Sequence, residues 1–117
     1  MDISFIDNNE KLPPNLPASE GWSRHGIIKG GMVIGNIIYN LKTGFIDHLT
    51  VNKEERCKGY GATILKHVES VVRDAGCRVL MVLLLSNTED FYVKQGYIIL
   101  HRTSQTIQPR SIALKYL

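Results

Sequence analysis

The stretch from Phe45 to Leu85 restricts the fold more than any other part of this 117-residue chain. Within it, six apolar residues recur with the spacing of a single helical face: Ile64, Leu65, Val68, Val71, Val72 and Ala75. Gly76 is predicted to end this helix, and the apolar run Val79–Leu85 predicts a strand covered on both faces. A further strand is predicted at Phe45–Val51, so the stretch forms a βαβ unit with parallel strands.

The rest of the chain predicts a mostly antiparallel sheet around this unit. Alternating or β-branched residues predict further strands at Ile3–Ile6, His25–Lys29, Met32–Tyr39, Tyr97–His101 and Ile112–Tyr116. Gly30-Gly31 predicts a tight hairpin, and the S-x-x-E spacing of Ser86 and Glu89 predicts a capping box for a short helix that ends at Gly96. We expect one α/β domain over residues 1–117, with a mixed sheet and a central parallel βαβ unit.

The composition argues against several classes of protein. Lysine and arginine exceed aspartate and glutamate by 14 − 11 = +3, but no block of five like charges occurs, so no nucleic-acid partner is expected. No apolar run approaches the roughly 20 residues that span a bilayer, so no membrane partner is expected. The first residues lack the features of a secretory signal, and two cysteines make no disulfide framework, so we expect a cytoplasmic protein. The four histidines show no zinc spacing, and no metal site is predicted.

The turn between the strand at Phe45–Val51 and the helix carries an R-x-x-G-x-G pattern. Its fixed positions are Arg56, Gly59 and Gly61. The first turn of a helix offers unpaired N–H groups and the positive end of the helix dipole, and glycine lets a phosphate approach the backbone closely. Arg56 and Lys58 add positive charge. The pattern therefore predicts an anion site; the alternative is that the glycines only permit the turn from strand to helix.

This segment resembles the acyl-CoA-binding motif of the GNAT N-acetyltransferase superfamily, written R/Q-x-x-G-x-G/A. A second stretch, Phe91–Tyr97, is similar to the superfamily's F-Y-x-K-x-G-F/Y signature. The order of the predicted elements over residues 25–117 also fits that superfamily. The resemblance implies an enzyme that uses acetyl-CoA as its acyl donor.

The resemblance places the donor site at two strand ends and at the glycine loop. The strands that contain Leu49–Val51 and Leu83–Leu85 are expected to splay apart, with the pantetheine arm bonded to the main-chain edge at the first of them. Backbone N–H groups of the glycine loop are expected to hold the diphosphate. The donor-binding residues implied in this way are Leu49, Val51, Arg56, Cys57, Lys58, Gly59, Tyr60, Gly61 and Asn87.

Three residues are candidates for the proton transfers. In many members of the superfamily the tyrosine at the position of Tyr92 protonates the departing thiolate; the alternative is that Tyr92 only packs a short helix. The strand Phe45–Val51 also resembles that of glucosamine-6-phosphate N-acetyltransferases, with Asp47 where those enzymes have Glu and His48 where they have Asp. Either is a candidate general base. Because adjacent strand residues point to opposite faces, at most one of the two is expected to reach the site directly.

The resemblance is weakest over residues 7–24, where the superfamily usually has two helices that wall the acceptor pocket. This chain has a short, proline-rich segment there, so we expect either an open acceptor site or a homodimer in which a second subunit completes it. We expect an N-acetyltransferase that moves an acetyl group directly to a primary amine of a small molecule, such as an amino sugar. The alternatives are an acyl-CoA-binding module of the same fold without catalysis and a small basic nucleic-acid-binding domain.

Overall fold

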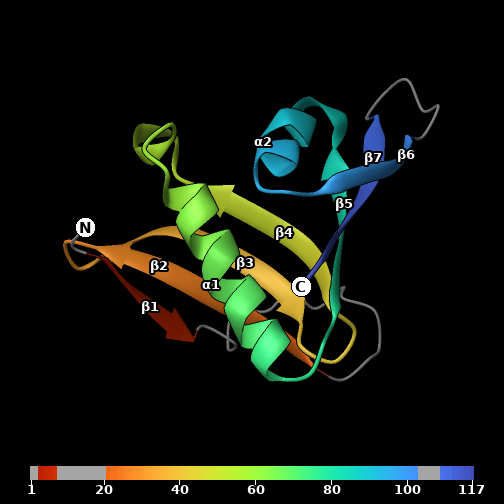
Figure 1. Ribbon diagram of the computed structural model, residues 1–117. Coiled ribbons are helices and arrows are strands. Elements are labelled where there is room, and N and C mark those ends of the chain that lie inside the picture. The colour runs from red at the N-terminus through yellow and green to blue at the C-terminus, as the bar shows by residue number, and fades with distance from the viewer. Residues whose placement is uncertain (1–2, 8–20, 103–108) are drawn as a thin grey trace.

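The predicted βαβ unit lies at the centre of the fold. In the computed structural model, strands β4 (Phe45–Val51) and β5 (Val79–Leu85) are parallel neighbours joined by helix α1 (Tyr60–Asp74) (Figure 1). The structure describes residues 3–7, 21–102 and 109–117. Its other elements are β1 (Ile3–Asp7), β2 (Trp22–Lys29), β3 (Met32–Asn40), the 3₁₀ turns η2 (Lys53–Glu55) and η3 (Ser86–Thr88), α2 (Glu89–Lys94), β6 (Ile98–Arg102) and β7 (Arg110–Tyr116).

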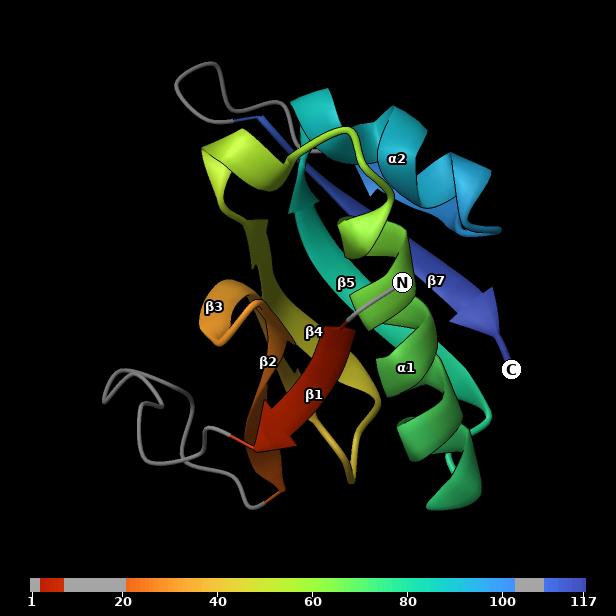
Figure 2. The same ribbon diagram turned by 90° about the vertical axis from the view of Figure 1, so that its left-hand side faces the viewer.

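The strands form one seven-stranded sheet in the order β1-β2-β3-β4-β5-β7-β6. Every neighbouring pair is antiparallel except β4 and β5, which confirms the expected mixed sheet. The two helices lie on the same side of this sheet, α1 against β3 and β4 and α2 against β6 (Figure 2). The last two strands pair as a hairpin, as predicted, but β7 is inserted between β5 and β6, so β6 forms the edge of the sheet.

Local sequence signals placed most element boundaries within a few residues. Gly76 has a φ of 99° just beyond α1, the left-handed conformation that ends many helices. Strand β2 begins at Trp22, which is three residues earlier than predicted and within the region 7–24. Residues 8–20 of that region lie outside the described ranges, as does the loop 103–108. No helix in the described ranges has the length and apolar character needed to cross a membrane.

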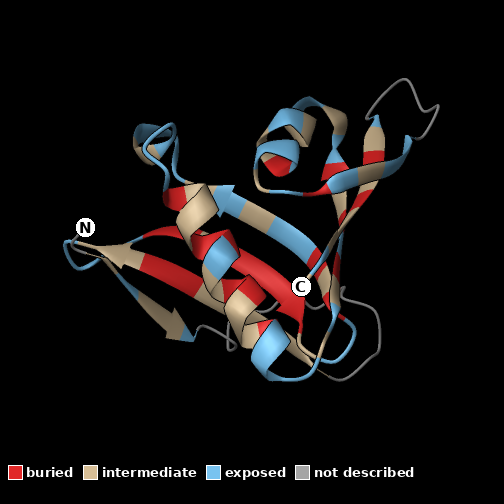
Figure 3. Ribbon diagram, viewed as in Figure 1, coloured by how far each residue is buried: buried red, intermediate tan, exposed pale blue. Residues whose placement is uncertain are grey.

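Strand β5 is covered on one face only, so the prediction of two-sided burial was wrong. Leu80, Val82 and Leu84 belong to the hydrophobic core beneath the helices, whereas Met81 and Leu85 are 39% and 42% exposed. Figure 3 shows buried residues, in red, on α1 and on the strands that it crosses. Because both helices lie on one side of the sheet, no described element covers the second face of β5. The apolar run predicts a strand here, but it does not predict whether one or both faces of that strand are covered.

The predicted capping box does not form. The hydroxyl of Ser86 lies in η3, 3.2 Å from that of Ser111, and Glu89 accepts hydrogen bonds from Arg102 and Ser111. Helix α2 begins at Glu89, and Thr88 makes no side-chain capping bond. Partners on β6 and β7, which are distant in sequence, replace the local cap.

A partly buried ion pair links α1 to β7 and to the end of α2. Glu69 on α1 accepts hydrogen bonds from the Tyr97 hydroxyl at 2.9 Å and from Lys115 Nζ at 3.0 Å. Lys115 Nζ also donates to the carbonyl oxygen of Gln95, just beyond α2, at 2.8 Å. Burial, together with the adjacent Glu69 carboxylate, raises the pKa of Tyr97, so its hydroxyl stays protonated. This network fixes α2 relative to α1.

Candidate functional site

The two parallel strands separate where the pairing of β4 becomes irregular. Strand β4 pairs with β5 only at its first two residues, Phe45 and Ile46, so residues 47–51 have no partner on that side among the described strands. On its other side, β4 pairs with β3 at Ile46 and at His48, which leaves Asp47 as the extra residue of a β-bulge. The expected gap between β4 and β5 is therefore present, and it begins at the bulge.

Main-chain groups of Leu49 and Val51 face this gap. The N–H of Asn52 donates to the carbonyl oxygen of Ile34 on β3 at 2.7 Å. Because successive residues of a strand direct their backbone groups to alternate sides, those of Leu49 and Val51 point away from β3. The free edge of β4 thus offers hydrogen-bonding groups to any ligand that lies between the two strands.

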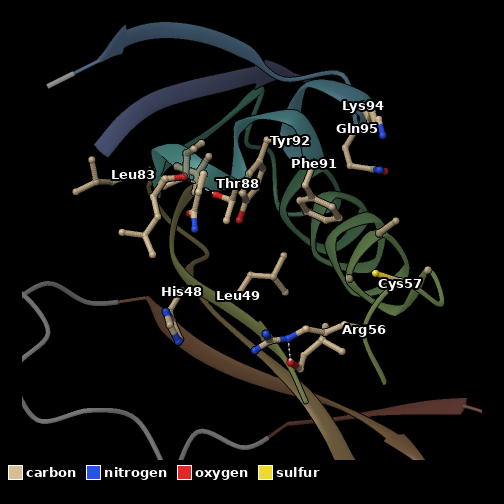
Figure 4. A pocket seen from close by; sticks show the side chains of 18 of the residues that line it. His48, Leu49, Arg56, Cys57, Leu83, Thr88, Phe91, Tyr92, Lys94 and Gln95 are labelled. Atoms are coloured by element: carbon tan, nitrogen blue, oxygen red, sulfur yellow. Dashed lines mark hydrogen bonds between the residues drawn. The ribbon is translucent and has the colours of Figure 1, made fainter. Parts of the chain in front are cut away.

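A cleft of about 1020 Å³ runs through the gap (Figure 4). It extends from β4 and β5 to η3, α2, the glycine loop and the start of α1. The cleft brings together most of the residues predicted for the site, namely Asp47, His48, Leu49, Val51, Arg56, Cys57, Gly59, Gly61, Asn87 and Tyr92.

Asp47 and His48 both line the cleft, so the expectation that only one of them would reach it was wrong. The bulge at Asp47 interrupts the alternation of side chains between these two positions. Both residues are exposed. In Figure 4, His48 lies toward one end of the cleft, opposite the end formed by Cys57 and α1.

The glycine loop has the backbone of an anion site. Cys57 and Gly59 adopt left-handed conformations, with φ of 64° and 87°, and Gly59 directly precedes α1. No side chain caps the first turn of α1, so its N–H groups are available to a ligand. A Cβ atom at Gly61 would lie 3.3 Å from the ring of Phe91, so the glycine permits close packing of α2 on α1.

Lys58 and Tyr60 do not line the cleft, in contrast to the other predicted residues. Glu55 pairs with Lys29 at 3.0 Å and with Lys58 at 3.4 Å, and the hydrogen bond from Lys29 lowers the pKa of Glu55. Tyr60 is buried in the core, with Lys29 Nζ 5.3 Å from the centre of its ring. These contacts fasten the loop to the end of β2.

Arg56 lies in the cleft but its side chain binds the protein backbone. Its Nε donates a hydrogen bond of 2.9 Å to the carbonyl oxygen of Val51, the last residue of β4 (Figure 4). In the same view the guanidinium group extends below Leu49 on the side toward His48, away from Cys57.

Tyr92 enters the cleft from α2 (Figure 4). Its ring packs edge to face against Phe91 and Tyr97, with centroid distances of 5.1 and 5.4 Å. Burial raises the pKa of Tyr92 to about 12. Within the described part of the chain its hydroxyl has no hydrogen-bond partner, and no buried polar side-chain atom there is unsatisfied. The hydroxyl is therefore protonated and open to the cleft.

Several lining residues were not predicted as site residues, namely Glu55, Thr88, Lys94, Gln95 and Arg110. Lys94 and Gln95 lie inside the second motif, so the motif itself could have suggested them. Arg110 comes from β7, and its position beside the end of β5 depends on the strand order. Among the described residues, no group of three or more His, Cys, Asp or Glu side chains is arranged to hold a metal ion.

Comparison with known proteins gives consistent matches. The profile of the acetyltransferase (GNAT) family matches residues 20–97. Histone acetyltransferase GCN5 of Oryza sativa subsp. japonica is 30% identical over 76 residues, which is 61% of this chain but only 15% of the plant protein. The fold is similar to that of an IAA acetyltransferase from Bacillus cereus ATCC 14579, with a TM-score of 0.76, 16% identity and coverage of 98% and 99% of the two chains. A GNAT family acetyltransferase from Elizabethkingia anophelis, solved with acetyl-CoA bound, has a TM-score of 0.74 at 13% identity, with 99% of each chain covered.

Proposed function

The chain belongs to the GNAT family of acetyltransferases, and we propose that it transfers an acetyl group from acetyl-CoA to a primary amine of a small molecule. The observation that carries the proposal is that three features meet in one cleft: the free edge of β4, the uncapped start of α1 and the hydroxyl of Tyr92. Proteins of similar fold have been solved with acetyl-CoA or coenzyme A bound, which supports the choice of donor.

The donor would lie along the cleft from α1 to His48. Backbone N–H groups of the glycine loop and the first turn of α1 face the diphosphate in this arrangement, because an uncapped helix start favours an anion. Leu49 and Val51 offer main-chain groups to the amide groups of the pantetheine arm. The apolar side chains of Val82, Leu84 and Phe91 line the same space and suit its methylene groups.

The proposed reaction is a direct transfer. The amine loses a proton to Asp47 or His48, directly or through water, and its nitrogen forms a bond to the acetyl carbon. A backbone N–H on the β4 edge stabilises the negative charge that develops on the acetyl oxygen. The bond from carbon to sulfur then breaks, and the Tyr92 hydroxyl gives its proton to the sulfur. No group of the protein becomes acetylated.

Two kinds of similarity bear on the class of acceptor. The resemblance of the β4 sequence to that of glucosamine-6-phosphate N-acetyltransferases favours an amino sugar as the acceptor. One protein of similar fold is an aminoglycoside 6'-N-acetyltransferase solved with coenzyme A. The similarity to a histone acetyltransferase keeps a peptide amine open, although Phe45 occupies the position where the catalytic glutamate of that group is expected. The second candidate function is an acyl-CoA-binding module without turnover, which would bind the same donor but release no thiol.

A thermal-shift titration tests the donor site. Acetyl-CoA at 100 times its dissociation constant should add about 2.7 kcal/mol to the free energy of unfolding and raise the Tm by roughly 10 °C. Gly61→Val should abolish this shift, because the added side chain displaces Phe91 at the cleft. Lys66→Val is the matched control, since it places the same residue on the exposed side of the same helix. Absence of a shift at millimolar acetyl-CoA would contradict the proposal; a shift without thiol release across an amine screen would favour the second candidate.

We also propose that the chain forms a homodimer through the uncovered face of β5, β7 and β6. Most of the large apolar side chains that are exposed in the described structure lie on these strands: Met81, Leu85, Ile98, Leu100 and Tyr116. Ile98 pairs with Leu114, which pairs with Met81, so these three form one row on that face. Strand β6 is also a sheet edge, where antiparallel pairing with the same strand of a second copy would continue the sheet.

Sedimentation at micromolar concentration tests the dimer. We expect the wild type to sediment as a dimer and Ile98→Lys to sediment as a monomer. Val93→Lys is the control, because Val93 is similarly exposed, at 51% against 53%, but lies on α2 on the other side of the sheet. A monomeric wild type would contradict the proposal. A cytoplasmic location also remains a proposal, which the two free thiols, Cys57 and Cys77, support.

A further inference from the structure

The side chain of Arg56, the first residue of the R-x-x-G-x-G motif, does not point toward the expected phosphate site. Its Nε donates a solvent-exposed hydrogen bond of 2.9 Å to the carbonyl oxygen of Val51. Its guanidinium group lies along β4 on the side toward His48, whereas the glycine loop and the start of α1 lie on the side of Cys57 (Figure 4). The arginine thus contacts the part of the cleft where the pantetheine arm and the acetyl group would lie.

The carbonyl of Val51 has no hydrogen-bond partner from β5 on the side of the gap. Its backbone groups point toward the gap, because the pairing of Asn52 with Ile34 fixes the direction of alternation along β4. Strand β5 pairs with no residue of β4 beyond Ile46. Arg56 therefore supplies the hydrogen bond that a neighbouring strand would supply in a continuous sheet.

The other restraints on the end of β4 come from β3, which pairs with it up to Val51 and accepts hydrogen bonds from the backbone and side chain of Asn52. Strand β3 holds it from one side, with Gly35 opposite Val51 and so close that a Cβ at Gly35 would lie 2.8 Å from the Thr50 carbonyl oxygen. Two other cations near the loop, Lys29 and Lys58, both pair with Glu55. The hydrogen bond of Arg56 ties this loop to the end of β4.

We propose that Arg56 is a positioning residue for the β4 edge, and that it acts on the pantetheine and acetyl half of the donor rather than on its phosphates. With the Val51 carbonyl occupied by Arg56, the N–H groups of Leu49 and Val51 remain as the donors of this edge. A fixed edge holds these N–H groups in place for the donor, as preorganised sites require. The inference rests on the proposed function, since it assumes that acetyl-CoA is the ligand.

Three probes separate the two halves of the donor. Acetyl-CoA contains both halves, S-acetylpantetheine lacks all phosphates, and adenosine 3',5'-bisphosphate lacks the pantetheine arm. We would measure the affinity of each probe by calorimetry or competition for wild type, Arg56→Ala, Arg56→Lys and Lys58→Gln. Lys58→Gln removes a neighbouring positive charge that pairs with Glu55 rather than with Val51, so it controls for the general electrostatic effect of the loop.

We expect Arg56→Ala to weaken acetyl-CoA and S-acetylpantetheine by the same factor, about tenfold, and to leave the affinity for the bisphosphate within twofold of wild type. Arg56→Lys should not restore binding, because lysine keeps the charge but loses the planar Nε donor. The proposal is overturned if the bisphosphate weakens with acetyl-CoA while S-acetylpantetheine is unaffected, or if lysine restores binding, or if no probe changes. Failure of wild type to bind acetyl-CoA would instead refute the proposed function, so the two failures are distinguishable.

Discussion

Replacing Tyr92 by phenylalanine is expected to lower kcat about 100-fold while leaving the affinity for acetyl-CoA within a factor of two. Phenylalanine keeps the ring that packs edge to face on Phe91 and Tyr97, so only the hydroxyl is lost. That hydroxyl is open to the cleft and has no partner among the described residues. The measurement is steady-state thiol release with saturating amine, together with a thermal-shift titration of acetyl-CoA.

The pKa values set the condition under which Tyr92 can donate its proton. Burial raises the pKa of Tyr92 to about 12. Proton transfer to an ordinary thiolate, with a pKa of about 8.5, would be uphill by about 5 kcal/mol at roughly 1.4 kcal/mol per pKa unit. Transfer therefore requires that burial beside Tyr92 also raises the pKa of the coenzyme A thiol. Because Tyr92 stays protonated between pH 6 and about 10, it should contribute no basic limb to the pH profile in that range.

Tyr116→Phe is the matched control, because it removes a phenol hydroxyl from a side chain that is 71% exposed at the end of β7. Its kcat should equal that of the wild type. If Tyr92→Phe also leaves kcat unchanged, then Tyr92 is not the proton donor and its role is packing alone.

Replacing Glu69 by leucine is expected to lower the free energy of unfolding by about 3 kcal/mol and the Tm by more than roughly 10 °C. The substitution leaves the Lys115 ammonium and the Tyr97 hydroxyl without the carboxylate that accepts both of their hydrogen bonds. The pair is buried enough for the cost to be large, since the two side chains are 10% and 27% exposed. Thermal and denaturant unfolding measure the loss.

Two further variants make this expectation specific. Glu69→Leu combined with Lys115→Met should be more stable than Glu69→Leu alone, because no unpaired charge then remains. Arg102→Ala, which breaks an ion pair whose arginine is 66% exposed, should cost less than about 1 kcal/mol. A loss from Glu69→Leu as small as that from Arg102→Ala would show that the network is not important for stability.

Because Lys115 also binds the Gln95 carbonyl, Glu69→Leu should also weaken the placement of α2 and, with it, that of Tyr92.

Much of the fold could be predicted from local patterns. The helical spacing from Ile64 to Ala75 predicted α1. The predicted strand bounds Phe45–Val51 and Val79–Leu85 are those of β4 and β5. The glycine pattern of Arg56, Gly59 and Gly61 placed the loop before α1 at the cleft. These features depend on the periodicity and conformational preferences of neighbouring residues, which the sequence contains directly.

Other features depend on contacts between distant segments. The burial of β5 on one face reflects the placement of both helices on one side of the sheet, and the missing capping box reflects partners on β6 and β7. Lys58 and Tyr60 carry the expected residue types for a ligand site, yet Glu55 and Lys29 hold them outside the cleft. No local pattern specifies such partners, because they are set by strand order and helix packing.

The sequence by itself determined the βαβ unit and the position of the glycine loop, and its resemblance to the GNAT superfamily supplied the candidate residues Tyr92, Asp47 and His48. Only the tertiary structure decided that Asp47 is the extra residue of a bulge, that His48 shares the cleft with it, and that Arg56 binds the carbonyl oxygen of Val51. The physical reason is that a helix or a glycine turn is specified by nearby residues. A bulge and a free strand edge exist only in relation to neighbouring strands, which are brought together by the whole sheet.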